Sequence, residues 1–271
     1  MTRSQPTLAR RALGRGLRRL REASRMTVPE AAAAIGYSRQ TIARIEAGSQ
    51  PSRTQQIKAL CETYGAPVEQ QSYLTALAVK SNERGWWEAN KAGVIPEFRL
   101  YAEAEQEAVE MLIYEPEFVP GIAQADSYIR ALLAADPPRT PEIGDAIRAF
   151  RLQRQELLYA RSPLPRITML LGAGTWAYLR HAPSAVQVEQ AKRLMEVTSL
   201  PGIEVLLTTQ PHPAMGSGFT VLTPPDDDGP AFAYMDAIDG CRYVEDPDVV
   251  SHYRRAFSRA REVASPIEEH L

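Results

Sequence analysis

Apolar residues recur with a helical period through the first 80 positions of the chain. Leu13, Leu17 and Leu20 are spaced i, i+4, i+7, and Ile42 and Ile45 form a similar apolar face further along. Glycine or proline residues separate these runs. The pattern predicts five short helices, around residues 13–20, 27–35, 38–48, 54–64 and 68–79.

Capping residues mark the boundaries of the second and third predicted helices. Thr27 and Glu30 have the spacing of a capping box, and Pro29 between them suits a first helical turn. Gly36 is suited to end the second helix in the left-handed conformation. Ser38 can then cap the third helix, which we expect to end at Gly48.

The pattern changes in the second part of the chain. Three helical stretches are predicted first, over residues 97–116, 126–135 and 141–162. Short strand-like runs follow at 166–174, 202–210, 218–224, 231–237 and 241–246, between loops rich in Pro, Gly and Asp. Helices are also predicted at 185–200 and 247–264, with a short last one beginning at Ser265-Pro266. The fold class is therefore α+β, an all-α five-helix unit followed by a larger α+β unit.

These elements suggest four parts of the chain. Residues 1–12 read as a flexible basic arm and residues 13–81 as the helical domain. Residues 82–97 form a junction, in which we expect Trp86 and Trp87 to dock the two domains together. Residues 98–271 form the second domain.

The net charge of −2 conceals an uneven distribution. Residues 1–75 hold twelve Arg/Lys and five Asp/Glu, a net +7, while the remaining nineteen Arg/Lys and twenty-eight Asp/Glu give −9. A basic first part on an acidic body indicates a polyanionic partner for the first part alone.

The cellular setting follows from cysteines and apolar runs. The two cysteines, Cys61 and Cys241, form no CxxC and fit reduced thiols. The longest uncharged apolar run, residues 167–179, has 13 residues and is shorter than the roughly 20 that span a bilayer. We read it as a buried strand and its continuation. We expect a cytoplasmic, nucleoid-associated protein without a membrane partner.

The third predicted helix carries groups that could read DNA. If Ile42 and Ile45 face inward, then Arg39, Gln40 and Arg44 face outward. Arginine suits the O6 and N7 atoms of guanine, and glutamine suits the N6 and N7 atoms of adenine. Ser38 and Thr41 could contact a phosphate or a thymine methyl group. The alternative is an ordinary solvated basic helix face.

The run "MTVPEAAAAIGYSRQTIARIEAGSQPSRTQQIKALCETYGAP" resembles the Cro/C1-type (XRE family) helix-turn-helix regulators. The resemblance implies a structural ion pair between Arg21 and Glu46, and base contacts from Arg39, Gln40 and Arg44. The family often has Gln near the start of its second helix, as a phosphate donor, where this chain has Val28. That contact is either missing or moved to Thr27 or to the backbone at the helix N-terminus. Arg15 and Arg18 are further candidates for phosphate contacts.

The chain from about Trp86 onward resembles DUF5753, a domain found in Scr1-like, antitoxin-like regulators of actinobacteria. The resemblance is carried by "WW", "AEAEQEAVEMLIYEPEFVPGIAQADSYIRALL", "RLQRQELL", the run at 216–222 and the closing helix ending in "SP". It implies that this domain binds a small DUF397-type partner protein or mediates dimerisation. The alternative is a small-molecule sensor with its effector pocket in this domain.

No catalytic, cofactor or metal-binding motif is present, so we expect neither an enzyme nor a metal or cofactor site. The segment Gly172–Gly174 is at best a fragment of a nucleotide loop, and Asp226–Asp228 reads as a solvated turn. His212 lies in a loop, and His181 and His252 read as surface or capping residues. Trp176 and Tyr178 are expected in the core, against the alternative of a ligand pocket.

These observations predict a sequence-specific DNA-binding transcriptional regulator. One recognition helix reads too few bases to be selective across a genome, so we expect a homodimer on a palindromic operator. Its half-sites would lie about 34–36 Å apart. Repression, by covering a promoter, is favoured over activation.

Overall fold

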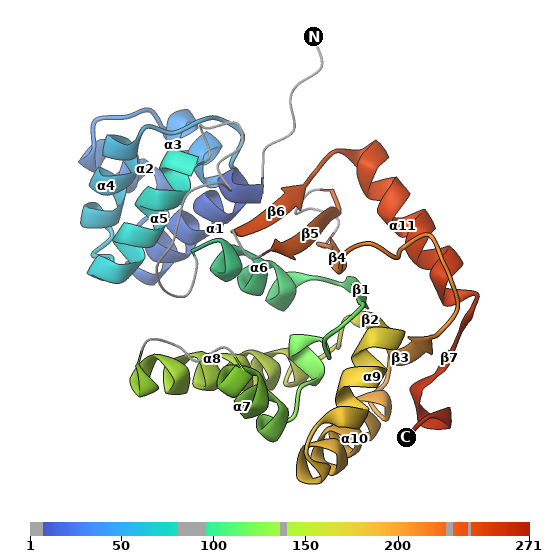
Figure 1. Cartoon of the computed structure of the whole chain (residues 1–271). Coiled ribbons are helices and arrows are strands. Elements are labelled where there is room, and N and C mark those ends of the chain that lie inside the picture. The colour runs from blue at the N-terminus through green and yellow to red at the C-terminus, as the bar shows by residue number, and fades with distance from the viewer. Residues whose placement is uncertain (1–7, 81–95, 136–139, 226–229, 238–239) are drawn as a thin grey trace. The chain divides into compact units, whose positions relative to one another are not determined.

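The computed structural model describes residues 8–80, 96–135, 140–225, 230–237 and 240–271 (Figure 1). The chain forms two compact units that divide inside helix α6, between Leu100 and Tyr101. We call the first the helical unit and the second the sheet unit. The architecture is α+β, as the sequence predicted, because all strands of the described residues lie in the sheet unit.

The helical unit contains the five predicted helices. They are α1 (Leu8–Ala23), α2 (Val28–Ala34), α3 (Arg39–Glu46), α4 (Thr54–Thr63) and α5 (Val68–Lys80). Apolar residues at helical spacing form its core, since Leu17, Ile42 and Ile57 are all fully buried. This core fixes which face of each helix is left for solvent or for a partner.

Helix α1 begins earlier than expected, because residues 8–12 were assigned to the flexible arm and are helical. The apolar stripe continues toward the N-terminus through Ala9, which is buried one turn before Leu13. Alanine is the best helix former and is small, so it extended the stripe without a strong hydrophobic signal. Residues 1–7 of the predicted arm lie outside the described residues.

The sheet unit begins with helices and ends with a strand-rich half. Its elements in chain order are α6 (Pro96–Glu107), β1 (Glu110–Glu115), η2 (Gly121–Ala123), α7 (Asp126–Ala135), α8 (Pro141–Tyr159), β2 (Arg166–Gly172), α9 (Ala173–His181), α10 (Ser184–Thr198), β3 (Ile203–Thr208), β4 (Phe219–Thr223), β5 (Phe232–Ala237), β6 (Gly240–Val244), α11 (Pro247–Arg261), β7 (Ala264–Pro266) and η4 (Ile267–Glu269).

The prediction of one helix over residues 97–116 is wrong. Helix α6 ends at Glu107, and the run "EMLIYE" forms β1, with Met111 and Ile113 buried on one face and Tyr114 on the other. A short apolar run of this kind suits a buried strand or a buried helix equally well. Its position in the middle of the sheet, between two strands that are distant in sequence, decides for the strand.

The seven strands form one mixed sheet in the order β6-β5-β4-β1-β2-β3-β7. Strands β1, β2 and β3 are parallel neighbours, joined by connections that contain α7, α8, α9 and α10. Strands β4, β5 and β6 add to the other side of β1 in antiparallel fashion. Strand β1 is therefore the point at which the parallel and antiparallel halves of the sheet meet.

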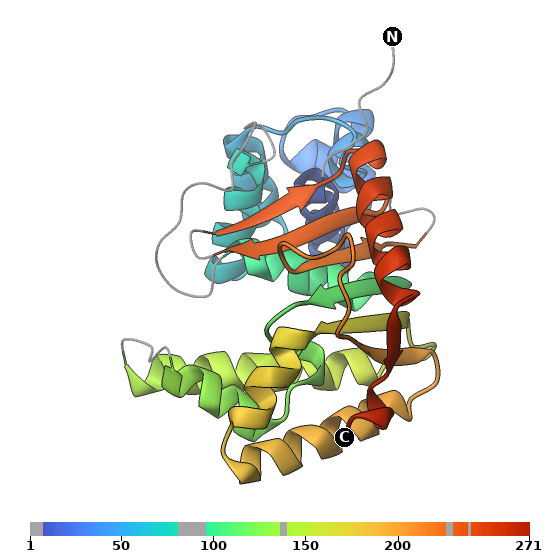
Figure 2. The same ribbon diagram turned by 45° about the vertical axis from the view of Figure 1, so that its right-hand side comes forward.

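Helix α11 covers one face of this sheet and crosses its strands (Figure 2). Its Phe257 packs in a buried cluster with Leu170, Phe219 and Val221. Helix α6 lies on the other face, where the ring of Tyr101 stacks on Tyr234 with centroids 4.2 Å apart. Residues that alternate along each strand thus belong to two different environments.

The run at 167–179 does not continue as a strand, because β2 ends at Gly172 and α9 begins at Ala173. The glycines of "GAG" allow close packing. A Cβ atom at Gly172 or Gly174 would lie 2.8 or 2.6 Å from backbone atoms of Pro116. They serve the contact between the ends of β1 and β2, and no further glycine of a nucleotide loop follows.

Two more expectations need correction. The final segment contains β7, which pairs with β3, before the short helical turn η4 that was expected there. Three residues are too few for an alternating pattern to predict a strand. Tyr178 is 62% exposed and is not a core residue, whereas Trp176 is half-buried and contacts the ring of His270.

Some expectations concern residues outside the described ranges. Trp86 and Trp87 of the junction and the turn Asp226–Asp228 are among them. Within the described ranges, every helix is too short or too polar to cross a bilayer.

Candidate nucleic-acid interface

The α2-turn-α3 segment has the local structure that its sequence predicted. Thr27 caps α2 through a capping box with Glu30, and Pro29 occupies the first turn. Gly36 has a φ of 71° after the end of α2. The Ser38 Oγ atom caps α3 by accepting a hydrogen bond from Thr41 N (3.1 Å). The two helices thus meet through a turn of four residues, 35–38, as a helix-turn-helix requires.

Helix α3 separates its apolar and polar side chains sharply. Ile42 and Ile45 are buried at 0% and 1% exposure. Arg39, Gln40 and Arg44 are all exposed. The structure therefore places the three predicted base-contacting residues on the outside of the unit.

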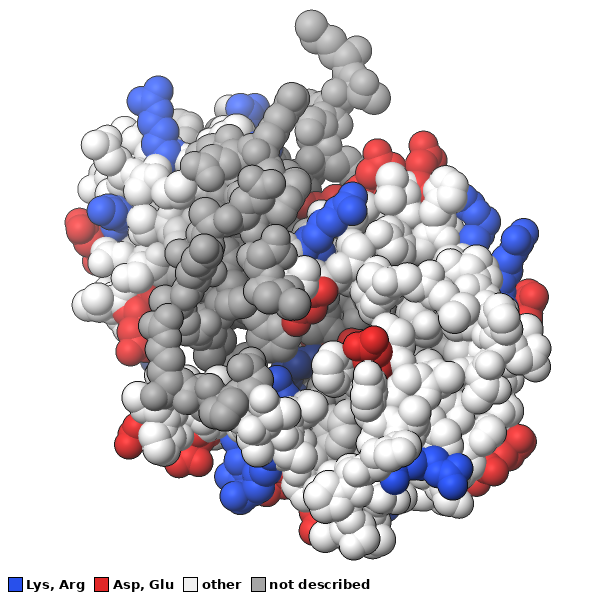
Figure 3. All heavy atoms as spheres, viewed as in Figure 1, with Lys and Arg blue, Asp and Glu red and all other residues white. Residues whose placement is uncertain are grey.

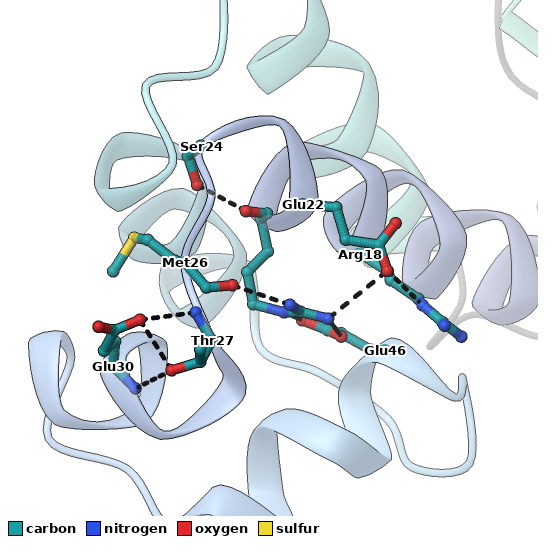
Figure 4. Close-up of polar contacts among 8 residues, drawn as sticks. Arg18, Glu22, Ser24, Met26, Thr27, Glu30 and Glu46 are labelled. Atoms are coloured by element: carbon teal, nitrogen blue, oxygen red, sulfur yellow. Dashed lines mark hydrogen bonds and ion pairs between the residues drawn. The ribbon is translucent and has the colours of Figure 1, made fainter.

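An ion pair fixes the end of α3 to α1 (Figure 4). The Arg21 guanidinium donates from Nε to Glu46 Oε1 (2.7 Å) and from Nη2 to Glu46 Oε2 (2.8 Å). Its Nη1 atom donates to the carbonyl of Met26 (2.9 Å), in the loop before α2. The pair implied by the family resemblance is present, and it ties three elements together with charge-assisted hydrogen bonds.

The surroundings of this pair include residues that the sequence reasoning missed. Tyr64 is buried beside it, and burial together with the Glu46 carboxylate raises the pKa of Tyr64 to about 12. A Cβ atom at Gly14 would lie 2.4 Å from the Glu46 carbonyl oxygen. Gly48 combines a φ of 64° with a similar approach to Arg10 of α1. These glycines let α3 end directly against α1.

Thr27 was one of the groups expected to take over the phosphate contact that Val28 cannot make. Its hydroxyl instead donates to Glu30 Oε2 (2.7 Å), and its backbone N–H donates to the same carboxylate oxygen (2.7 Å). These hydrogen bonds hold the pKa of Glu30 below its usual value. A carboxylate thus occupies the N-terminus of α2, so a phosphate could contact Thr27 only if Glu30 moved away.

The two arginines of α1 differ in exposure. Arg18 is exposed and donates to Glu22 Oε1 (2.9 Å), one turn later in the helix. Arg15 is half-buried. Because exposed ion pairs are weak, a phosphate could displace Glu22 from Arg18 at little cost.

The hydroxyls of Ser38 and Thr41 hydrogen-bond each other (2.9 Å). Both residues are at the N-terminal end of α3, next to Arg39 and Gln40. The face of the molecule drawn in Figure 3 carries Lys and Arg (blue) interspersed with Asp and Glu (red), without a continuous basic patch among its described residues.

The three histidines singled out in the sequence lie in different surroundings. His181 and His252 are exposed, and a ring nitrogen of each hydrogen-bonds a backbone carbonyl of its own helix. His212 packs edge-on against Tyr114, and burial lowers its pKa. Among the described residues, no group of three or more His, Cys, Asp and Glu could hold a metal ion.

Two family models match the chain. One described as "Helix-turn-helix domain" matches residues 12–74, and one described as "Domain of unknown function (DUF5753)" matches residues 98–270. Comparison with curated proteins gives no match. A solved structure, "Crystal structure of the clp gene regulator ClgR from C. glutamicum", is 26% identical and covers 30% of this chain and 99% of that chain. Its TM-score of 0.24 is too low to bear on the fold.

The first match contains the capped turn, the exposed face of α3 and the ion pair behind it. The second covers the sheet unit almost to its end and more than half of the chain. The chain belongs to the DUF5753 family, and its helix-turn-helix domain makes it a DNA-binding transcriptional regulator.

Proposed function

We propose that the protein is a sequence-specific repressor that binds palindromic DNA as a homodimer and reads bases with α3. The observation that carries this proposal is the separation of faces on α3. Ile42 and Ile45 are buried, and Arg39, Gln40 and Arg44 are exposed. A helix anchored by its apolar face presents its polar face at a fixed angle, as readout in the major groove requires.

The proposed contacts differ in their chemistry. Arg39 and Gln40 lie in the first turn of α3, where a recognition helix contacts base edges. Arg44 is one turn further along the same helix. Ser38, Thr41 and the α1 arginines Arg15 and Arg18 would contact phosphates, which position the protein without specifying sequence.

Two physical arguments support a homodimer and repression: the number of base pairs that must be read and the length of duplex that is covered. A single recognition helix contacts few base pairs, and each is worth about 1–3 kcal/mol of discrimination. Two copies related by a two-fold axis double that readout. A dimer on two half-sites also covers a full turn of duplex, which blocks access to a promoter.

The test is a salt titration of the full chain on a duplex selected by the chain from a random pool. Arg39→Ala should lose roughly 1–3 kcal/mol of discrimination between the selected duplex and a scrambled one. Arg18→Ala should instead weaken both duplexes alike and reduce the salt slope by about 1. Fluorescence anisotropy gives both quantities.

Arg53→Ala is a matched control, because Arg53 is an exposed arginine outside α3, before α4. It should leave discrimination unchanged. The proposed register of α3 is wrong if Arg39→Ala discriminates between the duplexes as well as the parent does. The dimer is tested separately by the mass of the protein–DNA complex, where one chain for each operator would contradict it.

A second candidate function concerns the sheet unit, which would bind the small DUF397-type protein implied by the family resemblance. Helix α10 exposes Val188 (69%) and Met195 (47%), seven residues apart and hence on one face. Exposed apolar residues grouped on one face favour a protein partner. Pull-down of that small protein by the full chain tests this role. Val188→Glu should abolish capture, whereas Arg255→Glu, at an exposed position of α11, should leave it unchanged.

A further inference from the structure

The interior of the sheet unit contains one ion pair that is fully matched. Arg154 and Glu105 join through two hydrogen bonds of 2.5 Å, with 9% and 0% of their side chains exposed. The guanidinium of Arg154 also lies over the ring of Tyr101, 5.3 Å from its centroid. Each charge of this pair is therefore compensated at short range.

Two charged groups close to this pair are not compensated in the same way. Within the described residues, the Glu115 carboxylate has neither an ion-pair nor a hydrogen-bond partner. Arg151 donates to the neutral Oε1 atom of Gln124 (3.1 Å). In the described part of the chain it reaches no carboxylate at ion-pair distance, although Asp236 lies near enough to favour its charge. Burying charge without a partner costs several kcal/mol, and such cost is typical of functional sites.

The register of the sheet places Glu115 in a row with Asp236. Ile113 pairs with Thr220 and Thr220 pairs with Tyr234. Continued past the last recorded pairs, this register places Glu115 beside Gly218 and Gly218 beside Asp236. The two carboxylates thus come from strands separated by roughly 9–10 Å, with a glycine between them.

The absence of a side chain at Gly218 gives the Glu115 carboxylate room to lie over this glycine. A Cβ atom there would lie 2.9 Å from Glu115 Oε2, so the carboxylate leans over the glycine. Asp236 is exposed, which gives the row an open end toward solvent. Tyr114, the residue before Glu115, belongs to the buried cluster under α11. Successive residues of a strand point to opposite faces, so the row lies on the face of the sheet opposite α11.

Aromatic side chains lie beside this row. Tyr234 precedes Asp236 by two residues on the same face of β5, and its ring stacks on Tyr101. The Tyr234 hydroxyl is buried and makes no hydrogen bond of normal length in the described part of the chain. It lies near the Asp236 carboxyl and opposes the rise in the pKa of that group, so it points into the row. Such a hydroxyl can still donate to or accept from a bound molecule.

We propose that the Glu115–Gly218–Asp236 row binds a small organic cation, an aromatic or aliphatic primary amine whose ammonium group lies between the two carboxylates. Tyr234 would supply the hydrogen-bonding hydroxyl and a ring face for the cation. This site would make the sheet unit a small-molecule sensor, the alternative that its sequence left open. The inference goes beyond the proposed DNA-binding function and does not depend on it.

The charges around the row favour a cation. Glu105 and Arg154 cancel, which leaves the Glu115 and Asp236 carboxyls and the single positive charge of Arg151. When both carboxyls are ionised, they carry one more charge than Arg151 compensates. Burial, and after it the neighbouring Asp236 carboxylate, together raise the pKa of Glu115 to about 7. An ammonium group would reverse this effect, so its binding near neutral pH should release a proton from Glu115.

The test is isothermal titration calorimetry of the full chain, without DNA, with three probes of similar size. They are benzylammonium, benzyl alcohol and benzoate. We expect benzylammonium to bind at least tenfold more tightly than the other two. Repeating the titration at pH 7 in buffers of different ionisation enthalpy should reveal proton release.

Glu115→Gln should weaken benzylammonium binding at least tenfold and abolish the proton release. Glu117→Gln is the matched control, since Glu117 is exposed two residues later, and it should bind as the parent does. Circular dichroism establishes that both variants are folded. The proposal is overturned if benzoate binds as tightly as benzylammonium, if Glu115→Gln binds benzylammonium unchanged, or if none of the probes binds at millimolar concentration.

Discussion

The two units treat buried charge differently. In the helical unit, the guanidinium of Arg21 meets both oxygens of Glu46 and a backbone carbonyl. In the sheet unit, a pair of the same kind joins Arg154 and Glu105, but Glu115 on the neighbouring strand stays without such a partner. In the helical unit, the polar groups proposed for recognition point outward, on α3.

This difference teaches where each unit can bind a ligand. A unit that recognises a large external polymer needs a rigid interior that holds an exposed helix at one angle. A unit that encloses a small molecule needs polar groups inside whose partners are supplied by that molecule. Until that molecule binds, the buried polar groups without partners lower the stability of the folded protein.

The largest effect should come from breaking the pair in the sheet unit. Glu105→Gln leaves the Arg154 guanidinium buried without a counter-charge, which should cost about 3–5 kcal/mol. Chemical denaturation followed by tryptophan fluorescence and circular dichroism measures this loss. Replacing both partners, with Glu105→Leu and Arg154→Met, should recover most of it. Equal losses in the single and double variants would show that the charge is not the cause.

The matching change in the helical unit should have a smaller effect. Glu46→Gln removes the counter-charge of Arg21, whose side chain is 11% exposed and can be partly hydrated. We expect a loss of about 3 kcal/mol, the lower end for a buried pair. Thermal unfolding measures it, and DNA affinity should fall because α3 loses its anchor. Normal stability in this variant would contradict the structural role of the pair.

The contact between α1 and α3 can be tested at two glycines of the same helix. Gly14→Ala places a methyl group against the backbone of Glu46, and overpacking of this kind costs about 1–3 kcal/mol. Gly16→Ala meets only the movable end of the Leu74 side chain, at 2.5 Å. Because alanine also gains about 1 kcal/mol of helix propensity, Gly16→Ala should be close to neutral. Equal denaturation midpoints for the two variants would argue against close helix contact at Gly14.

The uncompensated carboxyl of the sheet unit gives a prediction on pH. The pKa of Glu115 is raised to about 7 in the fold, above its value of roughly 4.3 in an unfolded chain. The folded state therefore binds this proton more tightly than the unfolded chain does. The free energy of unfolding should fall as pH rises from about 4 to 7, because Glu115 then loses its proton in the fold. Glu115→Gln should then be more stable than the parent by about 1–2 kcal/mol at pH 8. The gain should vanish at pH 4, and a gain that is independent of pH would point to packing instead.

The smallest effect should come from the exposed pair of α1. Arg18→Ala removes the hydrogen bond to Glu22, where both side chains are more than half exposed. Exposed pairs of this type contribute little to stability. The unfolding temperature should stay within experimental error of the parent, and the change should appear only in DNA affinity. A clear loss of stability would mean that Arg18 is not available to a phosphate.

The sequence predicted the helical unit well, because the patterns that define its helices each lie within a short stretch of chain. The spacing of Ile42 and Ile45, the cap at Ser38 and the glycine turn lie within a few residues of one another. The start of α1 was placed too late, since Ala9 is a weak apolar signal. The failure at β1 has a different origin. Its four apolar residues are compatible with a helix or a strand, and only pairing with β2 and β4 decides between them.

The sequence by itself determined the five-helix unit, the outward face of α3 and the general succession of helices and strands, because each depends on periodicity or on a cap of a few residues. Only the tertiary structure decided that β1 is the central strand and that Glu115, Gly218 and Asp236 share one row. Glu115 is about a hundred positions from Gly218, and Asp236 lies on a later strand. No local sequence pattern shows which strand pairs with which. Sheet register is set by contacts between distant segments, so the candidate ligand site became visible only in the folded chain.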